Sequence, residues 1–155
     1  MVILMSTEYR VGNLLEQSDL THLAHQANLY HTFGSGIAKA IKDKYPRAFE
    51  ADLLTARGNK YKLGSWSVSK GTPTIFNLYS QIGMGSDDRK TSYDELDIVL
   101  RALEAHLRKE DGVKLGLPHF LGCGLANGDW KIVGAMIESI FQGSSVEVVI
   151  CRLKS

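Results

Sequence analysis

Two glycine-containing segments, each lying between a short apolar run and a helical pattern, constrain the fold more than any other feature of this sequence. The first is HTFGSG at 31–36, between the apolar run LTHLAH and an apolar stripe of helical spacing over 37–45. The second is GCGLANGDW at 122–130, between VKLGLP and a similar stripe over 132–140. Strand, glycine loop and helix in succession, found twice in one chain, indicate an α/β fold with a largely parallel sheet.

The remaining patterns agree with this fold class. Pro46 stops the first helix, and a second helix is expected at about 47–57, ending at Gly58. Ser92 and Glu95 have the spacing of a capping box and predict the start of a third helix. Further strands are expected at about 2–11, in KLGSWSVSK and TIFNLYSQ around the turn 71–73, and in SVEVVICRL. The sequence therefore predicts one domain over 1–155, an α/β/α sandwich of three layers with a mixed, mostly parallel central sheet.

Composition excludes several classes of protein. Hydrophobic residues make up 44% of the chain and charged residues 23%, as in a globular domain, and the net charge of +1 gives no basic field for nucleic acid. The apolar start at 2–5 is too short to span a membrane. Cys123 and Cys151 lie far apart with no metal-ligand spacing, so we expect free thiols in a reducing cytoplasm and no zinc site. We also expect a monomer with no metal or other cofactor.

The two glycine loops have a chemistry of their own. Backbone N–H groups at the start of a helix have no intrahelical acceptor, and glycine lets an anion approach them closely. Two such junctions in one small domain suggest two phosphates, and so a pyrophosphate. The alternative is that both glycine segments are only tight turns between a strand and a helix.

Four segments, in order, resemble the macro-domain family. They are VGNLL at 11–15, AHQANLYHTFGSGIA at 24–38, LPHFLGCGLANGDW at 117–130 and VVICRL at 148–153. Together they extend over nearly the whole chain from about residue 7. Within the family the sequence is most similar to the ADP-ribose-1''-phosphate phosphatase type, the ADP-ribose glutamate hydrolase type and macro proteins of tailed phages.

The resemblance implies a pocket for ADP-ribose. In it Gly36, Ile37 and Ala38 would offer N–H groups to one phosphate, Phe33 would cover the distal ribose, and the Asn28 amide would bond the ribose hydroxyls. A local turn bond is the alternative role for Asn28. The other positions that the resemblance places around the ligand are Gly12, Asn13, Leu14, Gln26, Ala27, Gly34, Ser35, Gln81, Leu121, Gly122, Cys123, Gly124, Leu125, Ala126, Asn127, Cys151 and Arg152.

Three positions depart from common family patterns. Asn13 stands where an Asp usually accepts from the adenine amino group, so that bond would lack charge assistance. Gln81 stands where the glutamate-hydrolase type has its nucleophilic lysine, and Ala126 where that type has its acid–base Asp. Because neither an amide nor a methyl group can take these roles, the lysine-adduct mechanism is not expected here.

Catalytic candidates follow from the phosphatase type, which carries a histidine at the position of His25. An imidazole can transfer protons near neutral pH, although a histidine at a strand end can also serve only to bond the backbone. Asn28 would hold the sugar, and Asp129 is a candidate base whose alternative role is to cap a helix. His31 is a weaker candidate, and the other histidines, His22, His106 and His119, are expected to be structural or exposed.

The preferred function is therefore binding of ADP-ribose and hydrolysis of ADP-ribose-1''-phosphate to ADP-ribose and phosphate. One alternative is removal of ADP-ribose from a modified macromolecule. Nucleic acid is expected as a partner only if it is such an ADP-ribosylated substrate. Another is a reader that binds ADP-ribose without turnover. A bare nucleotide- or RNA-binding module is disfavoured by the neutral charge.

Overall fold

The computed structural model describes residues 7–83, 89–124 and 126–154. Its strands form one sheet in the order β1-β6-β5-β2-β4-β3, in which β3 is antiparallel to β4 and the other neighbours are parallel. The strands are β1 (Glu8–Val11), β2 (His22–Asn28), β3 (Trp66–Ser69), β4 (Thr74–Gln81), β5 (Lys114–Pro118) and β6 (Glu147–Arg152). The helices are α1 (Gly36–Lys44), α2 (Pro46–Leu53), α3 (Tyr93–Leu107) and α4 (Trp130–Phe141), with 3-10 turns η1 (Leu14–Glu16) and η2 (Lys60–Lys62).

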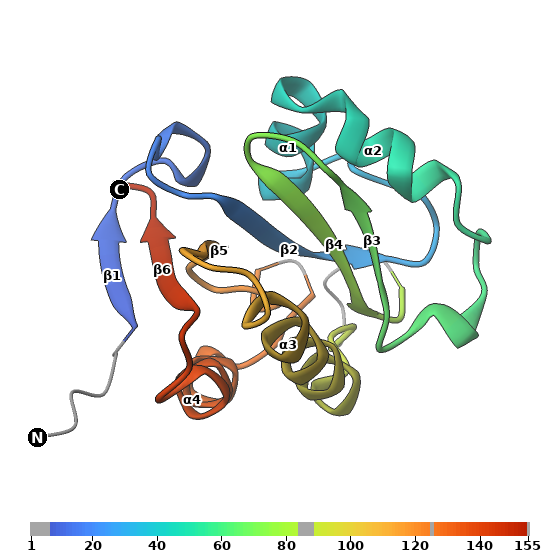
Figure 1. The fold of residues 1–155 in the computed structure, drawn as a ribbon. Helices are drawn as coiled ribbons and strands as arrows, with labels where there is room; N and C mark the ends of the chain where they lie inside the picture. The colour runs from blue at the N-terminus through green and yellow to red at the C-terminus, as the bar shows by residue number, and fades with distance from the viewer. Residues whose placement is uncertain (1–6, 84–88, 125, 155) are drawn as a thin grey trace, which may run out of the picture.

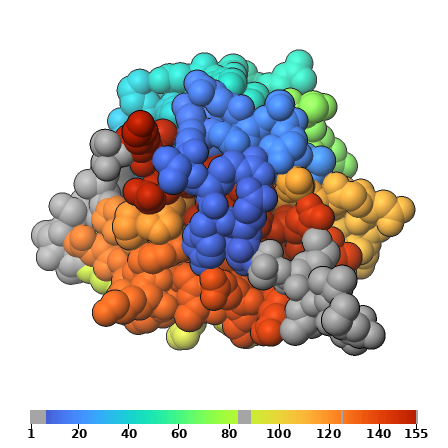
Figure 2. Space-filling model, turned by 90° about the vertical axis from the view of Figure 1, so that its left-hand side faces the viewer, coloured from blue at the N-terminus to red at the C-terminus, as the bar shows by residue number. Residues whose placement is uncertain are grey.

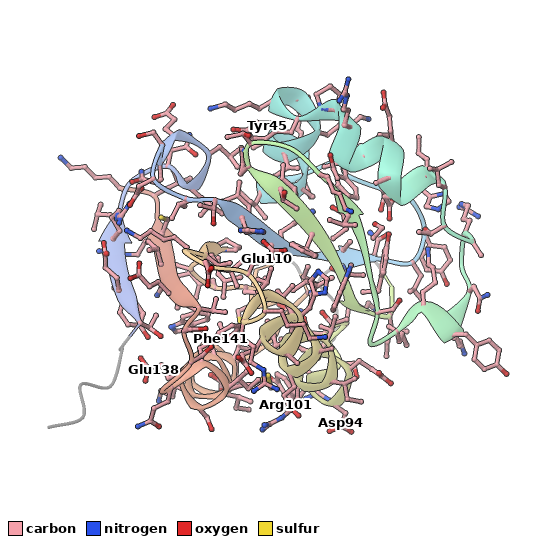
Figure 3. All side chains as sticks on the ribbon, in the orientation of Figure 1. Tyr45, Asp94, Arg101, Glu110, Glu138 and Phe141 are labelled. Carbon is pink, nitrogen blue, oxygen red and sulfur yellow. The ribbon has the colours of Figure 1, made fainter. Side chains whose placement is uncertain are left out.

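The sheet lies between two helical layers. Helices α1 and α2 cover one face, and α3 and α4 cover the other (Figure 1). The view onto the β1 edge shows the first strand between the two layers, with the first helices above and the region of α4 below (Figure 2). Tyr45, where α1 meets α2, and Phe141, at the end of α4, lie on opposite sides of the sheet (Figure 3). This arrangement confirms the predicted α/β/α sandwich with its mixed, mostly parallel sheet.

Alternation along the strands divides the core between the two faces. In β4 the side chains of Phe76 and Leu78 pack in the cluster with α3 and α4, while Ile75 packs in the cluster with Ile41 of α1. A third, small cluster around Tyr79 lies on the same side as α2. Because both faces are covered, the inner strands are apolar on both sides rather than alternating between apolar and polar.

Two predicted boundaries differ in the structure. The first strand begins at Glu8, and the predicted residues 2–6 lie outside the described chain. Helix α2 ends at Leu53 rather than near 57. Gly58 does not end this helix; its N–H instead donates to the Leu29 carbonyl, at 2.6 Å. The glycine with φ 72° therefore serves a tertiary contact with the residue that follows β2, which local helix-ending rules cannot anticipate.

Helix α3 begins where the sequence predicts, but only half of the capping box forms. The Ser92 hydroxyl accepts from the Glu95 N–H. The Ser92 N–H, which a full capping box would give to the Glu95 side chain, donates to the Ser80 carbonyl at 2.8 Å. The cap therefore also fixes the helix start against β4.

The chain leaves the two central strands in opposite directions. Strands β2 and β5 are parallel neighbours; β2 leads into α1 on one face, and β5 leads towards α4 on the other. Such a divergence opens a crevice at the carboxyl ends of parallel strands, and ligands of α/β proteins bind there. Both glycine loops of the sequence begin at this edge. No helix among the described residues is long and apolar enough to cross a membrane.

Candidate functional site

A pocket of about 450 Å³ occupies this crevice, within the range of small-molecule sites. It is lined by the ends of β2, β4 and β5 and by the two glycine loops. The lining residues are Gln26, Ala27, Asn28, Thr32, Gly34, Ser35, Gly36, Ile37, Ala38, Gln81, Pro118, His119, Phe120, Leu121, Gly122, Gly124 and Ala126. The structure thus brings together most of the residues expected around the ligand.

The first glycine turn presents a helix N-terminus to the pocket. Gly36 opens α1 with φ 59°, in the left-handed region that favours glycine, and a Cβ built there would meet nothing within 4 Å. Ser35, the N-cap, makes no side-chain bond to the helix. The N–H groups of the first turn therefore have no capping side chain, and Gly36, Ile37 and Ala38 all line the pocket.

The second glycine turn is a closed loop. The Gly128 N–H donates to the Gly122 carbonyl at 2.9 Å, and a Cβ at Gly128 would lie only 2.4 Å from that carbonyl oxygen. Gly122 has φ 71°, and Cys123 N–H donates to the Phe120 carbonyl at 2.7 Å. Glycine is required where the backbone approaches itself this closely, and the bond between Gly128 and Gly122 closes the turn.

One end of the pocket is aromatic, beside β6. The backbone N–H of His119 donates to the Cys151 carbonyl. The centroid of the His119 ring lies 4.0 Å from that of Phe120 and 4.7 Å from that of Trp130. Phe120 has φ 65° and is half exposed in the lining. The sequence does not single out Phe120 as a pocket residue, and it predicts that His119 is structural or exposed, yet both line the pocket. The signal was the pair His-Phe between a strand and a glycine loop.

The opposite end of the pocket, at β2 and β4, is made of side-chain amides. Gln26, Asn28 and Gln81 line it, and each is held by other protein groups. The Asn28 amide oxygen accepts from the Tyr30 N–H at 2.8 Å, and its nitrogen donates to the Thr32 hydroxyl. Asn28 therefore makes the local turn that was the alternative to ligand binding, and it also faces the pocket.

His25 lies beneath this pocket and is not part of its wall. Its side chain is fully buried, with Nε2 2.7 Å from Asn77 Oδ1 and the ring edge-on to Phe33. The Asn77 nitrogen donates to the Ala48 carbonyl, so its oxygen accepts and Nε2 of His25 carries the hydrogen. Burial lowers the pKa of His25 to about 4, so the ring is neutral near pH 7. This placement argues against the expected acid–base role of His25.

Several other candidates make structural contacts. Phe33, expected to cover a sugar, is buried between His25 and Phe49 and does not line the pocket. The His31 ring lies 2.9 Å from the Thr55 carbonyl through Nε2, and thereby fixes the first loop to the end of α2. Asp129 caps α4 by accepting from the Lys131 N–H at 2.9 Å, which was the alternative to its role as a base.

The residues expected near an adenine lie at the edge of β6. The Gly12 N–H donates to the Arg152 carbonyl, and the Asn13 side chain caps η1 by accepting from the Leu15 N–H. Cys151 is buried. Leu14, expected at the same site, lines a different hollow near the end of α1. Gly12, Asn13, Leu14, Cys123, Asn127, Cys151 and Arg152 do not line the pocket, and Leu125 lies outside the described residues.

The described lining carries no Asp, Glu, Lys or Arg. Its titratable side chain near neutral pH is His119, whose pKa is lowered by burial and by the nearby Arg152. Burial and the Asp129 carboxylate raise the pKa of Cys123 to about 11, so this sulfur stays a thiol. Within the described residues, no group of His, Cys, Asp and Glu is placed to hold a metal ion. An anion in this pocket would be bound by N–H groups rather than by side-chain charges.

Known proteins share both sequence and fold with this chain, although no protein-family model matches it. An uncharacterized 17.5 kDa protein of enterobacteria phage T4 is 30% identical over 135 residues, covering 83% of this chain and 84% of that protein. Human ADP-ribose glycohydrolase OARD1 is 29% identical over 145 residues, which cover 94% of this chain and 90% of OARD1. The macrodomain of Mycobacterium tuberculosis DarG superposes with a TM-score of 0.74 at 23% identity, and the match covers 94% of this chain and 97% of that macrodomain. The chain is a macro domain.

The membership confirms the resemblance on which the site residues were assigned. In this macro domain Gln81 and Ala126 both line the pocket, Gln81 at its amide end and Ala126 from the second glycine loop. Neither side chain can form a covalent adduct with a sugar or transfer a proton.

Proposed function

We propose that this macro domain binds ADP-ribose in the pocket between its two glycine turns. The observation that carries the proposal is the pairing of an uncapped helix N-terminus with a closed glycine loop across one cavity, whose described lining has no Asp, Glu, Lys or Arg. Such a site binds a pyrophosphate through backbone N–H groups. The name of the human relative, ADP-ribose glycohydrolase, supports the same ligand.

The two ends of the pocket fix the direction of the ligand in this proposal. The planar adenine lies at the aromatic end, near Phe120 and His119, because base and ring faces stack well. The pyrophosphate lies between the glycine turns. The distal ribose lies among Gln26, Asn28 and Gln81, whose amides are suited to sugar hydroxyls.

We further propose that ADP-ribose-1''-phosphate is the substrate, hydrolysed to ADP-ribose and phosphate. Water attacks phosphorus, the bond between phosphorus and the 1'' oxygen breaks, and a proton must reach that leaving oxygen. A phosphate monoester has a pKa near 6 and carries such a proton in part of its population at neutral pH. The substrate thus supplies a proton of its own, whereas His119, the titratable side chain of the described lining, has a lowered pKa and lies at the opposite, aromatic end. An acyl ester of ADP-ribose has no equivalent proton.

Binding is tested by calorimetric titration. ADP-ribose should bind with a micromolar dissociation constant, on the order of 8 kcal/mol. AMP should bind much more weakly, because it reaches the aromatic end and one phosphate subsite only. Equal affinities would show that the two turns do not share one pyrophosphate.

Turnover is tested by phosphate release from ADP-ribose-1''-phosphate. The wild type should release phosphate, and His25→Gln should retain its rate at pH 7 within a few-fold, because His25 does not line the pocket. A protein that binds ADP-ribose but releases no phosphate would instead be a reader. The absence of Asp, Glu, Lys and Arg from the part of the lining that the structure describes is the observation that favours this second function.

Phe120→Ala should lower the affinity for ADP-ribose roughly tenfold, since stacking of one base contributes about 1–3 kcal/mol. The ring is half exposed, so the melting temperature should change little. Tyr61→Ala is the matched control, because Tyr61 is almost fully exposed and does not line the pocket. Unchanged affinity of Phe120→Ala would place the base elsewhere.

A further inference from the structure

A chain of hydrogen bonds connects the second glycine turn to the amide end of the pocket. It begins at Thr91, which is buried between the turn and β2. The Thr91 hydroxyl donates to the Gly122 carbonyl at 2.5 Å. A carbonyl can only accept, so the single hydroxyl hydrogen of Thr91 is committed to Gly122. Towards any other neighbour the Thr91 oxygen acts only as an acceptor.

This commitment sets the orientation of Gln26. Its side-chain amide lies 3.0 Å from the Thr91 hydroxyl oxygen, which must receive a hydrogen from it. The nitrogen of Gln26 therefore faces Thr91. The Ser80 hydroxyl agrees with this orientation, since it donates to the amide oxygen of Gln26 at 2.7 Å.

Gln26 in turn sets the orientation of Gln81. The Gln26 nitrogen also donates to the amide oxygen of Gln81, at 3.3 Å. The Gln81 nitrogen then lies on the other side and donates to the Gly83 carbonyl at 2.6 Å. An amide nitrogen has two hydrogens, and the contacts found among the described residues use one of them. Gln81 lines the pocket, so its remaining N–H is the group that we take to be available as a donor to a ligand there.

We propose that Gln81 is a specificity-determining residue that donates a hydrogen bond to an anionic oxygen on C1'' of the distal ribose, and that Thr91 is the positioning residue that keeps this donor turned inward. The inference rests on the proposed function, because it assigns the amide end of the pocket to the distal ribose. It adds the residues that select this ligand: a donor at Gln81, held by Thr91, that favours an acceptor-only, negatively charged group such as phosphate at C1''.

The selectivity follows from what each ligand can accept. A phosphate oxygen only accepts, and its charge strengthens the bond. The C1'' hydroxyl of ADP-ribose can also donate, so it suits either orientation of the Gln81 amide. With the amide reversed, the Gln81 oxygen would face the phosphate and repel it. Because the described lining has no charged side chain, one donor carries much of this discrimination.

Thr91→Val tests the inference with almost no change of shape. Valine removes the acceptor that holds the Gln26 nitrogen. The Ser80 hydroxyl can accept as well as donate, so Gln26 can then reverse. The Gly83 carbonyl is then left to hold the Gln81 amide against the reversed Gln26 oxygen. Displacement of a fluorescent ADP-ribose, read in the first seconds before turnover, gives the affinities for ADP-ribose and for its 1''-phosphate. Thr91→Val should weaken the 1''-phosphate roughly tenfold or more, as expected for a bond to a charged group, and ADP-ribose less than about threefold. Thr91→Ser should restore the wild-type ratio.

Gln81→Glu gives the second readout, since it replaces the donor with a charged acceptor. The 1''-phosphate should lose roughly 100-fold in affinity, and ADP-ribose far less. If Thr91→Val and Gln81→Glu leave the ratio of the two affinities as in the wild type, whether both ligands lose affinity equally or neither does, the role is merely structural and the inference is overturned. A wild type that binds neither ligand would overturn the proposed function and this inference together.

Discussion

Gly36→Glu is expected to abolish ADP-ribose binding while the protein remains folded. The glycine opens α1 with φ 59° and lines the pocket, and a Cβ built there would meet no atom within 4 Å. A glutamate would put its carboxylate where the proposal places a phosphate and would block the N–H groups of the helix start. Calorimetry should show a loss of affinity of roughly 100-fold or more.

Backbone strain has to be separated from this effect. A side chain in the left-handed region costs about 1–2 kcal/mol of stability wherever it is introduced. Gly112→Glu is the matched control, because Gly112 has φ 68°, an open Cβ direction and a position in the turn before β5, away from the pocket. Both variants should lose similar stability, and only Gly36→Glu should lose binding. Equal binding by the two variants would move the pyrophosphate away from α1.

Acidification is expected to destabilise the protein through His25. The pKa of this buried ring is about 4 in the folded chain, below its ordinary value of 6.5. Between pH 4 and pH 6.5, His25 therefore binds a proton more readily in the unfolded chain than in the folded chain. The stability contributed by neutral His25 is fully present above pH 6.5 and is lost as the pH falls towards 4, by about 3 kcal/mol in total. Urea unfolding at a series of pH values measures this loss.

His25→Gln should flatten the dependence between pH 6.5 and 4.5, because glutamine can still donate to Asn77 but cannot take up a proton. His106→Gln is the control, since His106 is exposed on α3 and should leave the slope unchanged. A folded-state pKa of His25 near 6.5, read from the imidazole resonances, would contradict its burial. It would also restore the ring as a candidate acid or base.

Local features of the sequence predicted the frame of the site. The glycine turns could be found because each lies between an apolar strand and a helical stripe, and both signals are contained in a few neighbouring residues. Gly36 and Gly122 are at the pocket for that reason. The start of α3 at Ser92 and the end of α1 before Pro46 were likewise readable from capping and proline rules.

Tertiary contacts account for what the sequence could not show. The burial of His25 depends on Asn77 in β4 and on Phe33, which packs over it. Asp129 and Asn13 could be ligands or caps by residue type, and only the structure shows that both cap. Thr91 carries no local signal at all, because its partners on β2 and in the second turn are distant in sequence.

The site proposed for the pyrophosphate, between the two glycine turns, is tested most directly by an amide NMR titration of the wild-type protein with ADP-ribose. Backbone N–H resonances report hydrogen bonding at each residue, and glycine amides form a recognisable group. A pyrophosphate held between the two turns should give large, saturating shifts for Gly34 and Gly36 of the first turn and for Gly122 and Gly124 of the second, in one binding event, with Gly112 unchanged. Shifts confined to one turn, or gathered instead around Lys44 and Thr72 at the second hollow, would contradict it.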